Sequence, residues 1–237
     1  MALATKRTRK ARPIWKHPII RRFLRWTLIA VSAFYTLIVV VLILLRWMNP
    51  PFTAVQAERR VQSWTGHSQY NKQYAFVSLV RISPHLQHAV IAAEDARFFQ
   101  HHGFDWKEIG SAIEQDVENG RARGASTITQ QLVRNLFLTT HRSILRKGIE
   151  VSIVPLTESI LSKRRILELY LNVIEWGSGI YGAEAAARYY YNLPAQRLTR
   201  EQAVQLAAIL PSPLHRKPGH VAAYASRIQQ RMREMEW

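Results

Sequence analysis

The chain has 237 residues, of which 48% are apolar, and it contains no cysteine. This composition excludes a disordered chain, a disulfide-stapled scaffold and thiol catalysis, and the length suits one domain with an appendage. The net charge is +17, from 33 Lys and Arg against 16 Asp and Glu. The first acidic residue is Glu58, and ten of the basic residues precede Trp47, which leaves 23 basic against 16 acidic residues in the rest. Most of the high charge therefore belongs to an N-terminal tail, residues 1–25.

Twenty consecutive uncharged residues, Trp26 to Leu45, follow this tail. As a helix rising 1.5 Å per residue they extend about 30 Å, enough to cross the core of a bilayer. No small-residue cleavage site follows Leu45, so the sequence predicts an uncleaved transmembrane anchor over residues 26–46. The alternative is a buried core helix, which is rarely apolar on every face.

The basic tail predicts the topology of the protein in the membrane. Lys and Arg collect on the cytoplasmic side of a span, so we expect a cytoplasmic N-terminus and a domain outside the cytoplasm. A basic tail can also bind nucleic acid. Its position directly before the span favours topology as the explanation, and no nucleic-acid partner is expected.

The remainder of the chain is predicted to be mostly α-helical. Residues 47–82 form a juxtamembrane region and entry to the domain, with one strand at residues 74–80, and residues 83–237 form the domain itself. Ser83 and Pro84 suit a helix start, and Thr127 with Gln130 has the spacing of a capping box. The predicted helices are residues 83–99, 127–138, 143–159, 163–174, 183–191, a helix capped by Thr199 and Gln202 and stopped by Pro211, and an amphipathic helix over residues 219–236.

Glu94 is the first candidate catalytic residue. On a helix it lies near Val90 and Ile91, and a partly desolvated carboxylate has a raised pKa, which suits a general acid or base near neutral pH. The alternative is a surface ion pair with Arg97. His101 and His102 are adjacent and point apart on a helix, which favours packing or capping over metal binding. His85 and His88 have a ligand-like spacing without a clear third ligand.

A second candidate site begins at Gly124 and Ala125. Ser126 and Thr127 follow at a predicted helix start, where free backbone N–H groups and the helix dipole favour an anion. Arginines 121, 123 and 134 surround this point, which makes a phosphate or pyrophosphate site plausible. The alternative is an ordinary capped helix with solvated arginines.

A third cluster lies on residues 141–172. Arg146 and Glu150 share one helical face and could form a simple surface ion pair. With Arg134, Arg142 and Lys147, they could instead form a basic wall that neutralises a diphosphate leaving group. Residues 163–165, Lys-Arg-Arg, could hold lipid headgroups, but solvation is the favoured interpretation.

Several other patterns carry no chemistry. Residues 177–182 fit G-x-G-x-x-G, but they follow a helix and no βαβ unit surrounds them, so a dinucleotide site is rejected. The sequence contains no serine elbow, no zincin pattern and no penicillin-binding S-x-x-K, which leaves acyl transfer and zinc hydrolysis without support.

Taken together, these segments resemble the peptidoglycan glycosyltransferases that polymerise lipid II, especially the monofunctional, membrane-anchored members. The motifs occur in the family's order: Glu94-Asp95-x-x-Phe98-x-x-His101-x-Gly103; Gly124-x-Ser126-Thr127-Ile128-Thr129-Gln130-Gln131; Arg146-Lys147-x-x-Glu150; Lys163-x-x-Ile166-Leu167-Glu168-x-Tyr170-Leu171-Asn172; and the segment from Gly177 to Ala187.

The resemblance implies a lysozyme-like, mostly helical glycosyltransferase domain on one N-terminal transmembrane helix. It implies that Glu94 deprotonates the GlcNAc 4-hydroxyl of the acceptor lipid II, which attacks the growing chain with inversion and expels undecaprenyl pyrophosphate. Glu150 is then the second essential carboxylate. The residues implied to line the cleft or bind the substrate and its pyrophosphate are Ser126, Thr127, Gln130, Gln131, Arg134, Arg142, Arg146 and Lys147.

The resemblance also implies a divalent cation, Mg²⁺ or Mn²⁺, with Asp95 or Glu94 as candidate ligand, and no organic cofactor. The implied partners are lipid II, the lipid-linked glycan strand, the membrane and cell-wall synthesis or division proteins. The implied location is the bacterial inner membrane, with a periplasmic catalytic domain. Two positions depart from the family pattern, Ala125 for Gly and Arg134 for Lys, and neither removes a needed chemical group.

Two other functions compete with glycan polymerisation. A lytic, lysozyme-like enzyme would also use a glutamate in a helical cleft, but it has no diphosphate to neutralise. A non-catalytic membrane scaffold would carry degenerate motifs, and the presence of both glutamates argues against it.

Overall fold

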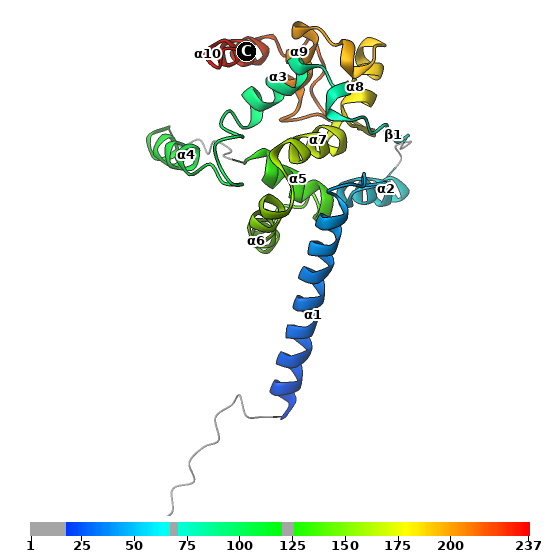
Figure 1. Ribbon diagram of the computed structural model, residues 1–237, viewed down its shortest axis with the longest axis vertical. Coiled ribbons are helices and arrows are strands. Elements are labelled where there is room, and N and C mark those ends of the chain that lie inside the picture. The colour runs from blue at the N-terminus through cyan, green and yellow to red at the C-terminus, as the bar shows by residue number, and fades with distance from the viewer. Residues whose placement is uncertain (1–17, 67–70, 120–125) are drawn as a thin grey trace, which may run out of the picture. The chain divides into compact units, whose positions relative to one another are not determined.

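A computed structural model describes residues 18–66, 71–119 and 126–237 of the chain (Figure 1). Residues 1–17 of the predicted basic tail lie outside the described residues, as do Arg121, Arg123, Gly124 and Ala125 of the predicted anion site. The chain divides into two compact units, residues 1–41 and residues 42–237.

The predicted N-terminal span is present as one long helix, α1 (Pro18–Leu44), of 27 residues. Its mean hydropathy of 2.7 and its length are sufficient to cross a membrane. The helix begins eight residues before Trp26, because Pro18 suits a first helical position and arginine is a good helix former. Only 11% of its most apolar stretch is buried, so the alternative of a core helix is wrong.

The second unit is mostly helical, as predicted. Its α-helices are α2 (Ala54–Thr65), α3 (Pro84–Glu94), α4 (Trp106–Asn119), α5 (Ile128–Phe137), α6 (Ile144–Ile160), α7 (Lys163–Val173), α8 (Ala183–Tyr191), α9 (Arg200–Ile209) and α10 (Ala222–Glu234). The sequence analysis did not predict α2 and α4. Two short 3₁₀ turns, η2 (Leu79–Arg81) and η3 (Ala195–Arg197), complete the helical content among the described residues.

Polar side chains begin several of these helices where the sequence predicts them. The Thr199 hydroxyl accepts a hydrogen bond from the Gln202 backbone N–H, and the Gln202 side chain accepts one from the Thr199 N–H, a complete capping box. Thr127 caps α5 in the same way, but only half of its predicted box forms. The Gln130 side chain instead accepts a hydrogen bond from Lys147, at 3.0 Å.

The predicted strand at residues 74–80 is wrong. Strand β1 is only Gln73–Tyr74. Beyond it the Val77 N–H donates to the Asn172 side chain at 2.9 Å, and the Leu79 N–H donates to the Glu168 carboxylate at 2.7 Å. Side chains of α7 therefore accept the hydrogen bonds of these backbone N–H groups, which a neighbouring strand would accept in a sheet.

A small three-stranded sheet, which was not predicted from the sequence, joins the segment before α3 to the segment between α7 and α8. Strand β3 (Ile180–Tyr181) is central, parallel to β1 and antiparallel to β2 (Glu175–Gly177). Gly182 leads from β3 into α8 with φ +87°, and a Cβ there would lie 2.6 Å from the Asn172 carbonyl oxygen. The glycine pattern at 177–182 thus serves a tight turn rather than a nucleotide.

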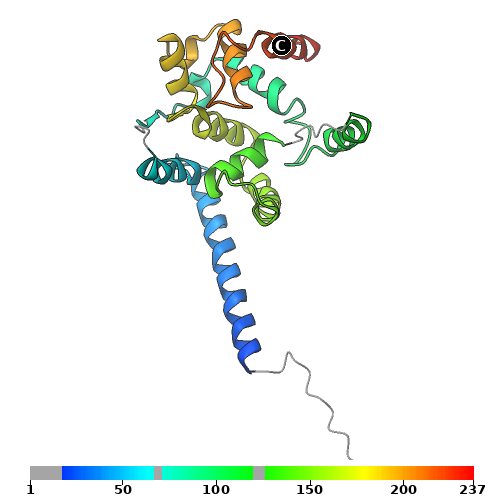
Figure 2. The same cartoon turned by 180° about the vertical axis from the view of Figure 1, so that it is seen from behind.

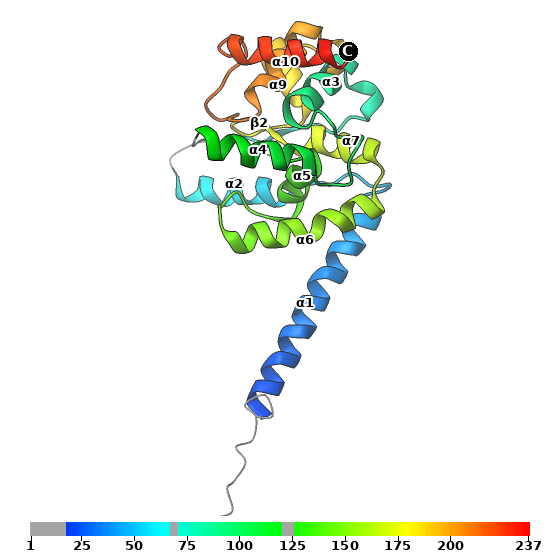
Figure 3. The same ribbon diagram turned by 90° about the vertical axis from the view of Figure 1, so that its left-hand side faces the viewer.

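The helices of this unit pack in two groups around α7. Helix α3 packs against α9 and α10, and α5 packs against α2, α6 and α7. Figures 2 and 3 show α3, α9 and α10 on one side of α7. Helices α5 and α6 lie on its opposite side. The largest fully buried side chains include Trp176, Tyr170, Tyr181 and Phe98. The arrangement confirms the predicted mostly α, lysozyme-like fold class.

The three basic residues 163–165 are not all solvated, contrary to the interpretation favoured from the sequence. Lys163 bonds Glu158 at 2.8 Å and lies 4.5 Å from the Phe98 ring centre. Arg165 donates to the backbone oxygens of Leu45 and Met48, at 2.8 and 2.7 Å. Arg164 alone is exposed. Through Arg165, helix α7 is therefore bonded to the segment that comes directly after α1.

Candidate active site

A cleft of about 870 Å³ is lined by the C-terminal end of α3 and by residues of α4, α5 and α10. Its volume is within the range of small-molecule sites. Its charged lining residues are Glu94, Asp95, Arg97, Asp105, Glu108, Arg134, Arg227, Arg231 and Glu234. Ser126, Thr127, Gln131 and Tyr224 add hydroxyl and amide groups. The lining is thus strongly polar and carries both signs of charge.

Glu94 is the last residue of α3, and its side chain is half-buried in this cleft. The Gln131 side-chain amide donates a hydrogen bond to Glu94 Oε2 at 2.8 Å. Burial raises the pKa of the Glu94 carboxyl, and the nearby Asp95 charge adds to the rise, while Gln131, Arg134 and Arg216 oppose it. A carboxylate of raised pKa in a cleft is suited to accept a proton near neutral pH.

The alternative in which Glu94 pairs with Arg97 is wrong. Arg97 is paired with Asp105, to which its Nε atom donates at 2.9 Å. The predicted helix also ends at Glu94 rather than at Phe99, and Asp95 adopts a non-helical conformation there. Ending the helix at Glu94 separates the directions of the two adjacent carboxylates.

Asp95 lines the cleft and also holds the loop that follows α3. One oxygen accepts the Ile128 backbone N–H at 3.0 Å, and the other lies 2.8 Å from His101 Nε2. Because His101 Nδ1 accepts the Gly103 N–H, its Nε2 carries the proton and donates to Asp95. His101 therefore has a structural role, as hydrogen-bond partner of Asp95 and Gly103, although it lies beyond the helix on which the sequence placed it.

The same contacts show how many hydrogen bonds each predicted metal ligand already accepts. Asp95, His101 and Asp105 bring ligand-type atoms within 4.8 Å of one another. Both Asp95 oxygens already accept hydrogen bonds, however, and Asp105 is occupied by Arg97 and the Glu108 N–H. Glu94 accepts only from Gln131 among the described residues, so its other oxygen is available to a cation. Mg²⁺ commonly takes one or two carboxylates and completes its shell with water and substrate phosphates.

The residues at the start of α5 divide between two locations. Ser126, Thr127, Gln131 and Arg134 line the cleft. Gln130 is buried and turns away toward Lys147 on α6. Adjacent residues on a helix point about 100° apart, which explains why neighbouring glutamines serve different groups.

Glu150 and its cations form a separate cluster on α6. Glu150 is completely buried and accepts hydrogen bonds from Arg146 at 2.7 Å and from Lys147 at 2.5 Å. The pair is therefore not the surface ion pair that the sequence left open. Arg142 precedes the helix and is exposed. In the described part of the chain, none of these four residues is part of the cleft's lining. Through Gln130 and Gln131, α5 lies between this cluster and Glu94.

Sequence reasoning missed the contribution of α10. Tyr224, Arg227 and Arg231 line the cleft from this helix, and Arg231 donates to the Ala92 carbonyl oxygen at 3.2 Å. The guanidinium groups of Arg216 and Arg227 lie 5.6 and 5.3 Å from the centre of the Tyr224 ring. The signal was the i, i+4 spacing of Arg227 and Arg231, which places two arginines on one face.

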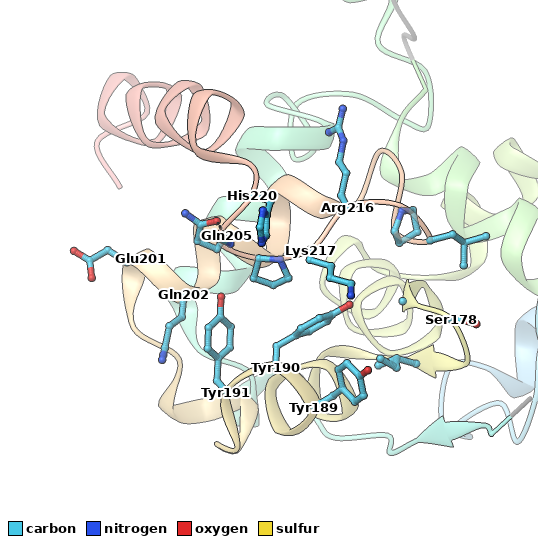
Figure 4. A pocket seen from close by; sticks show the side chains of 16 residues that line it. Ser178, Tyr189, Tyr190, Tyr191, Glu201, Gln202, Gln205, Arg216, Lys217 and His220 are labelled. Atoms are coloured by element: carbon cyan, nitrogen blue, oxygen red, sulfur yellow. Dashed lines mark hydrogen bonds between the residues drawn. The ribbon is translucent and has the colours of Figure 1, made fainter. Parts of the chain in front are cut away.

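A second pocket of about 650 Å³ lies between α8, α9 and the segment before α10 (Figure 4). Tyrosines 189, 190 and 191 line it, and the side chain of Lys217 extends toward the Tyr190 ring. No candidate site residue from the sequence analysis lies in it. Arg216 is shared by this pocket and the Tyr224 stack beside the cleft.

Comparison with known proteins agrees with this geometry. The transglycosylase family model matches residues 59–236. A biosynthetic peptidoglycan transglycosylase of Pseudomonas putida (strain W619) is 46% identical over 201 residues, covering 83% of this chain and 85% of that protein. Proteins of the same description from Pseudomonas aeruginosa and Laribacter hongkongensis are 44% and 45% identical, covering 90% and 79% of this chain and 92% and 84% of their own. The chain therefore belongs to the transglycosylase family and is a glycosyltransferase of peptidoglycan synthesis.

Proposed function

We propose that this enzyme transfers the growing glycan chain from undecaprenyl pyrophosphate to the GlcNAc 4-hydroxyl of lipid II, with inversion at the anomeric carbon. The observation that carries the proposal is the presence of Glu94 and Arg134 in one cleft. The first is a carboxyl whose pKa burial raises, and the second is a cation beside it that lowers that pKa. A base and a receptor for anionic charge are the two groups that this transfer requires.

In this mechanism Glu94 takes the proton of the acceptor hydroxyl as its oxygen attacks the anomeric carbon. A new C–O bond forms, the bond from that carbon to the pyrophosphate breaks, and its electron pair leaves on the diphosphate. Arg134, Arg227 and Arg231 lie in the same cleft and stabilise the charge that develops there. Arg146 and Lys147 of α6, both paired with Glu150, and exposed Arg142 would contact the diphosphate from outside the cleft.

A divalent cation, Mg²⁺ or Mn²⁺, is part of the proposal. Glu94 and the diphosphate oxygens of the substrate would hold it. Asp95 is the less available of the two candidate ligands, because each of its oxygens already accepts a hydrogen bond. Such an ion supplies additional charge neutralisation at the diphosphate.

The same proposal includes a location in the bacterial inner membrane. Arg21, Arg22 and Arg25 lie at the start of α1, which favours a cytoplasmic N-terminus and a periplasmic catalytic domain. A lipid-linked diphosphate leaves a bilayer only at high cost, so its polymerase benefits from an anchor. Protease added outside spheroplasts should digest the domain, and its protection would contradict this orientation. Cell-wall synthesis or division proteins remain predicted partners.

Charge in the cleft favours synthesis over cleavage of the glycan. Arg134, Arg227 and Arg231 are among its lining residues, and cleavage of an uncharged glycosidic bond leaves no diphosphate for them to neutralise. The described catalytic groups likewise disfavour a non-catalytic scaffold.

The experiment that tests the proposal is polymerisation of purified lipid II by the detergent-solubilised enzyme. Wild type should form long, lysozyme-sensitive strands. Glu94→Gln should form none while it folds and inserts normally, and Glu201→Gln, an exposed glutamate of α9, should match wild type. Chain growth by Glu94→Gln near the wild-type rate would remove Glu94 as the base.

A further inference from the structure

The second pocket, of about 650 Å³, is a groove with an aromatic wall of three successive tyrosines, residues 189–191 of α8 (Figure 4). The Tyr189 ring is 57% exposed and meets the Tyr190 ring edge to face, with 4.9 Å between the ring centres and an angle of 89°. The Tyr190 hydroxyl donates to the Trp176 carbonyl oxygen at 3.0 Å, which holds that ring in place. This tyrosine groove therefore offers a ligand one exposed ring beside a second, fixed ring.

Two side-chain amides of α9 also line the tyrosine groove. Gln205 Oε1 accepts the Gly219 N–H at 2.9 Å, and Gln202 Oε1 accepts the Thr199 N–H at 3.0 Å. Among the described residues neither amide NH₂ group has an acceptor, so both can donate to a ligand. A sugar ring has C–H faces that pack on aromatic rings, and its rim of oxygens accepts hydrogen bonds. Aromatic rings beside free amide donors therefore suit a saccharide.

The tyrosine groove carries more positive than negative charge. Its cations are Arg216 and Lys217, and Glu201 is the one acid among the described residues that line it. Figure 4 shows the Lys217 side chain extending toward the Tyr190 ring, whereas the Glu201 carboxylate points away from the tyrosine rings. A ligand carboxylate beside the rings would pair with Lys217 and would not contact Glu201. The charge therefore favours a saccharide that bears carboxylates over an uncharged one.

One short segment of the chain, residues 210–216, lines both this groove and the cleft. Residues 210–211 line the cleft, and residues 213–214 line the groove. Arg216 lines the groove as well, and its guanidinium lies 5.6 Å from the centre of the Tyr224 ring, which lines the cleft. The tyrosine groove is therefore next to the cleft, where a polymer that extends out of the cleft can reach it.

We propose that the tyrosine groove is a second saccharide site, which binds the glycan of peptidoglycan outside the cleft and holds the strand as it grows. The rings of Tyr189 and Tyr190 pack on sugar faces, and Gln202 and Gln205 donate to sugar oxygens. Lys217 pairs with a carboxylate of the peptides that this glycan carries. Binding requires only that the enzyme acts in peptidoglycan synthesis, whereas the holding of a growing strand rests on the proposed function.

Binding is tested by calorimetry with the detergent-solubilised full chain and three soluble probes. They are a disaccharide-peptide fragment of peptidoglycan with free carboxylates, the uncharged GlcNAc tetramer, and an acidic peptide without sugar. None carries a lipid diphosphate, so binding is measured without transfer. We expect the fragment to bind most tightly and the acidic peptide most weakly. Tighter binding of the acidic peptide than of the tetramer would overturn the proposal, because the groove would then be a peptide site.

Substitutions assign the binding to the tyrosine groove. Tyr189→Ala should weaken the binding of the fragment and the tetramer about fivefold or more, because both lose a ring contact. Lys217→Met should weaken the fragment about two- to fivefold at low salt and leave the tetramer unchanged. Trp64→Ala is the matched control, since Trp64 is an aromatic residue of α2 that is 74% exposed and lines neither cavity.

Wild-type binding of both saccharides by a folded Tyr189→Ala protein would overturn the site. Should that variant not fold, Lys217→Met carries the test, and unchanged binding of the fragment would overturn the site. Strand length tests the holding of the product. At equal consumption of lipid II, Tyr189→Ala should release shorter strands than wild type and Trp64→Ala, and strands of wild-type length would overturn this role. Binding that depends on Tyr189 in an enzyme that forms no strands would contradict only the proposed function.

Discussion

Nζ of Lys147 lies 2.5 Å from Oε1 of Glu150, a carboxylate with no exposure to solvent, although the lysine side chain itself is 44% exposed. The same lysine donates to Gln130, and Arg146 holds the second Glu150 oxygen. The buried Glu150 carboxylate thereby holds the side chains of Arg146 and Lys147 in place. In this structure Glu150 orients positive charge, whereas Glu94 lies in the cleft with an oxygen available.

The first prediction concerns the stability that Glu150 provides. Glu150→Gln leaves Arg146 and Lys147 without a charge partner, and Arg146 Nε is already buried without a hydrogen bond among the described residues. Lys147 is 44% exposed and Arg146 is partly exposed, so water can solvate both cations, and the cost should be about 1–3 kcal/mol rather than that of a fully buried pair. Chemical denaturation should show a loss of this size, against less than about 0.5 kcal/mol for exposed Glu201→Gln. Equal stability of the two variants would contradict the role of Glu150 as a structural counter-ion.

The second prediction concerns Glu94 and pH. Its pKa in the folded state is raised above the ordinary 4.5, mainly by burial, so the folded protein holds this proton more tightly than the unfolded chain does. The stability associated with it is complete below pH 4.5 and is lost as pH rises through the raised pKa. Glu94→Gln, which stays neutral, should therefore melt at the same or a higher temperature than wild type at pH 7 while losing activity. A lower melting temperature for this variant at pH 7 would contradict the burial argument.

The third prediction ranks two arginines. Arg134 lines the cleft and lowers the pKa of Glu94, whereas Arg142 is exposed and is not part of the lining. Arg134→Ala should reduce kcat about 100-fold, as loss of a transition-state charge contact does. It should also raise the pH below which the polymerisation rate falls, because Arg134 lowers the pKa of Glu94. Arg142→Ala should slow the departure of the diphosphate less than Arg134→Ala does, and it should not change the pH below which the rate falls. The reverse ranking would assign the leaving group to the α6 side.

The fourth prediction concerns Gly103, in the loop after Glu94. Its φ is +88°, and a Cβ there would lie 2.4 Å from Val154 Cγ1. Gly103→Ala should destabilise the fold by more than about 1 kcal/mol, because alanine is strained at positive φ and meets α6. Gly110, within α4, has open space around it, and Gly110→Ala should stabilise by about 0.5–1 kcal/mol. Thermal melting of the two variants should show shifts of opposite sign.

The fifth prediction concerns the divalent cation. Chelation with EDTA should slow lipid II polymerisation, and Mg²⁺ or Mn²⁺ should restore it. The loss should be smaller than that of Glu94→Gln, because three arginines share the neutralisation of the diphosphate. An Asp95→Asn variant that folds normally should keep the wild-type response to Mg²⁺. A changed metal requirement in that variant would make Asp95 a ligand after all.

Features that depend on local composition could be predicted before the fold was known. Twenty uncharged residues are sufficient to predict α1, and Thr199 with Gln202 is sufficient to predict a capped helix start, because both signals lie within a few residues. The ordered motifs likewise predicted Glu94 and Glu150 as the catalytic carboxylates, through the family resemblance. Each of these predictions needed only neighbours along the chain.

Which side chains meet across the fold could not be predicted in this way. Gln131 and Tyr170 are 39 positions apart, and only the packing of α5 on α7 makes them partners. Residues 77–79 have strand-like composition, yet distant α7 side chains satisfy their backbone. Arg231 comes to the cleft because α10 packs on α3. Hydrogen bonds and ion pairs depend on distance in space, and a sequence pattern reports only distance along the chain.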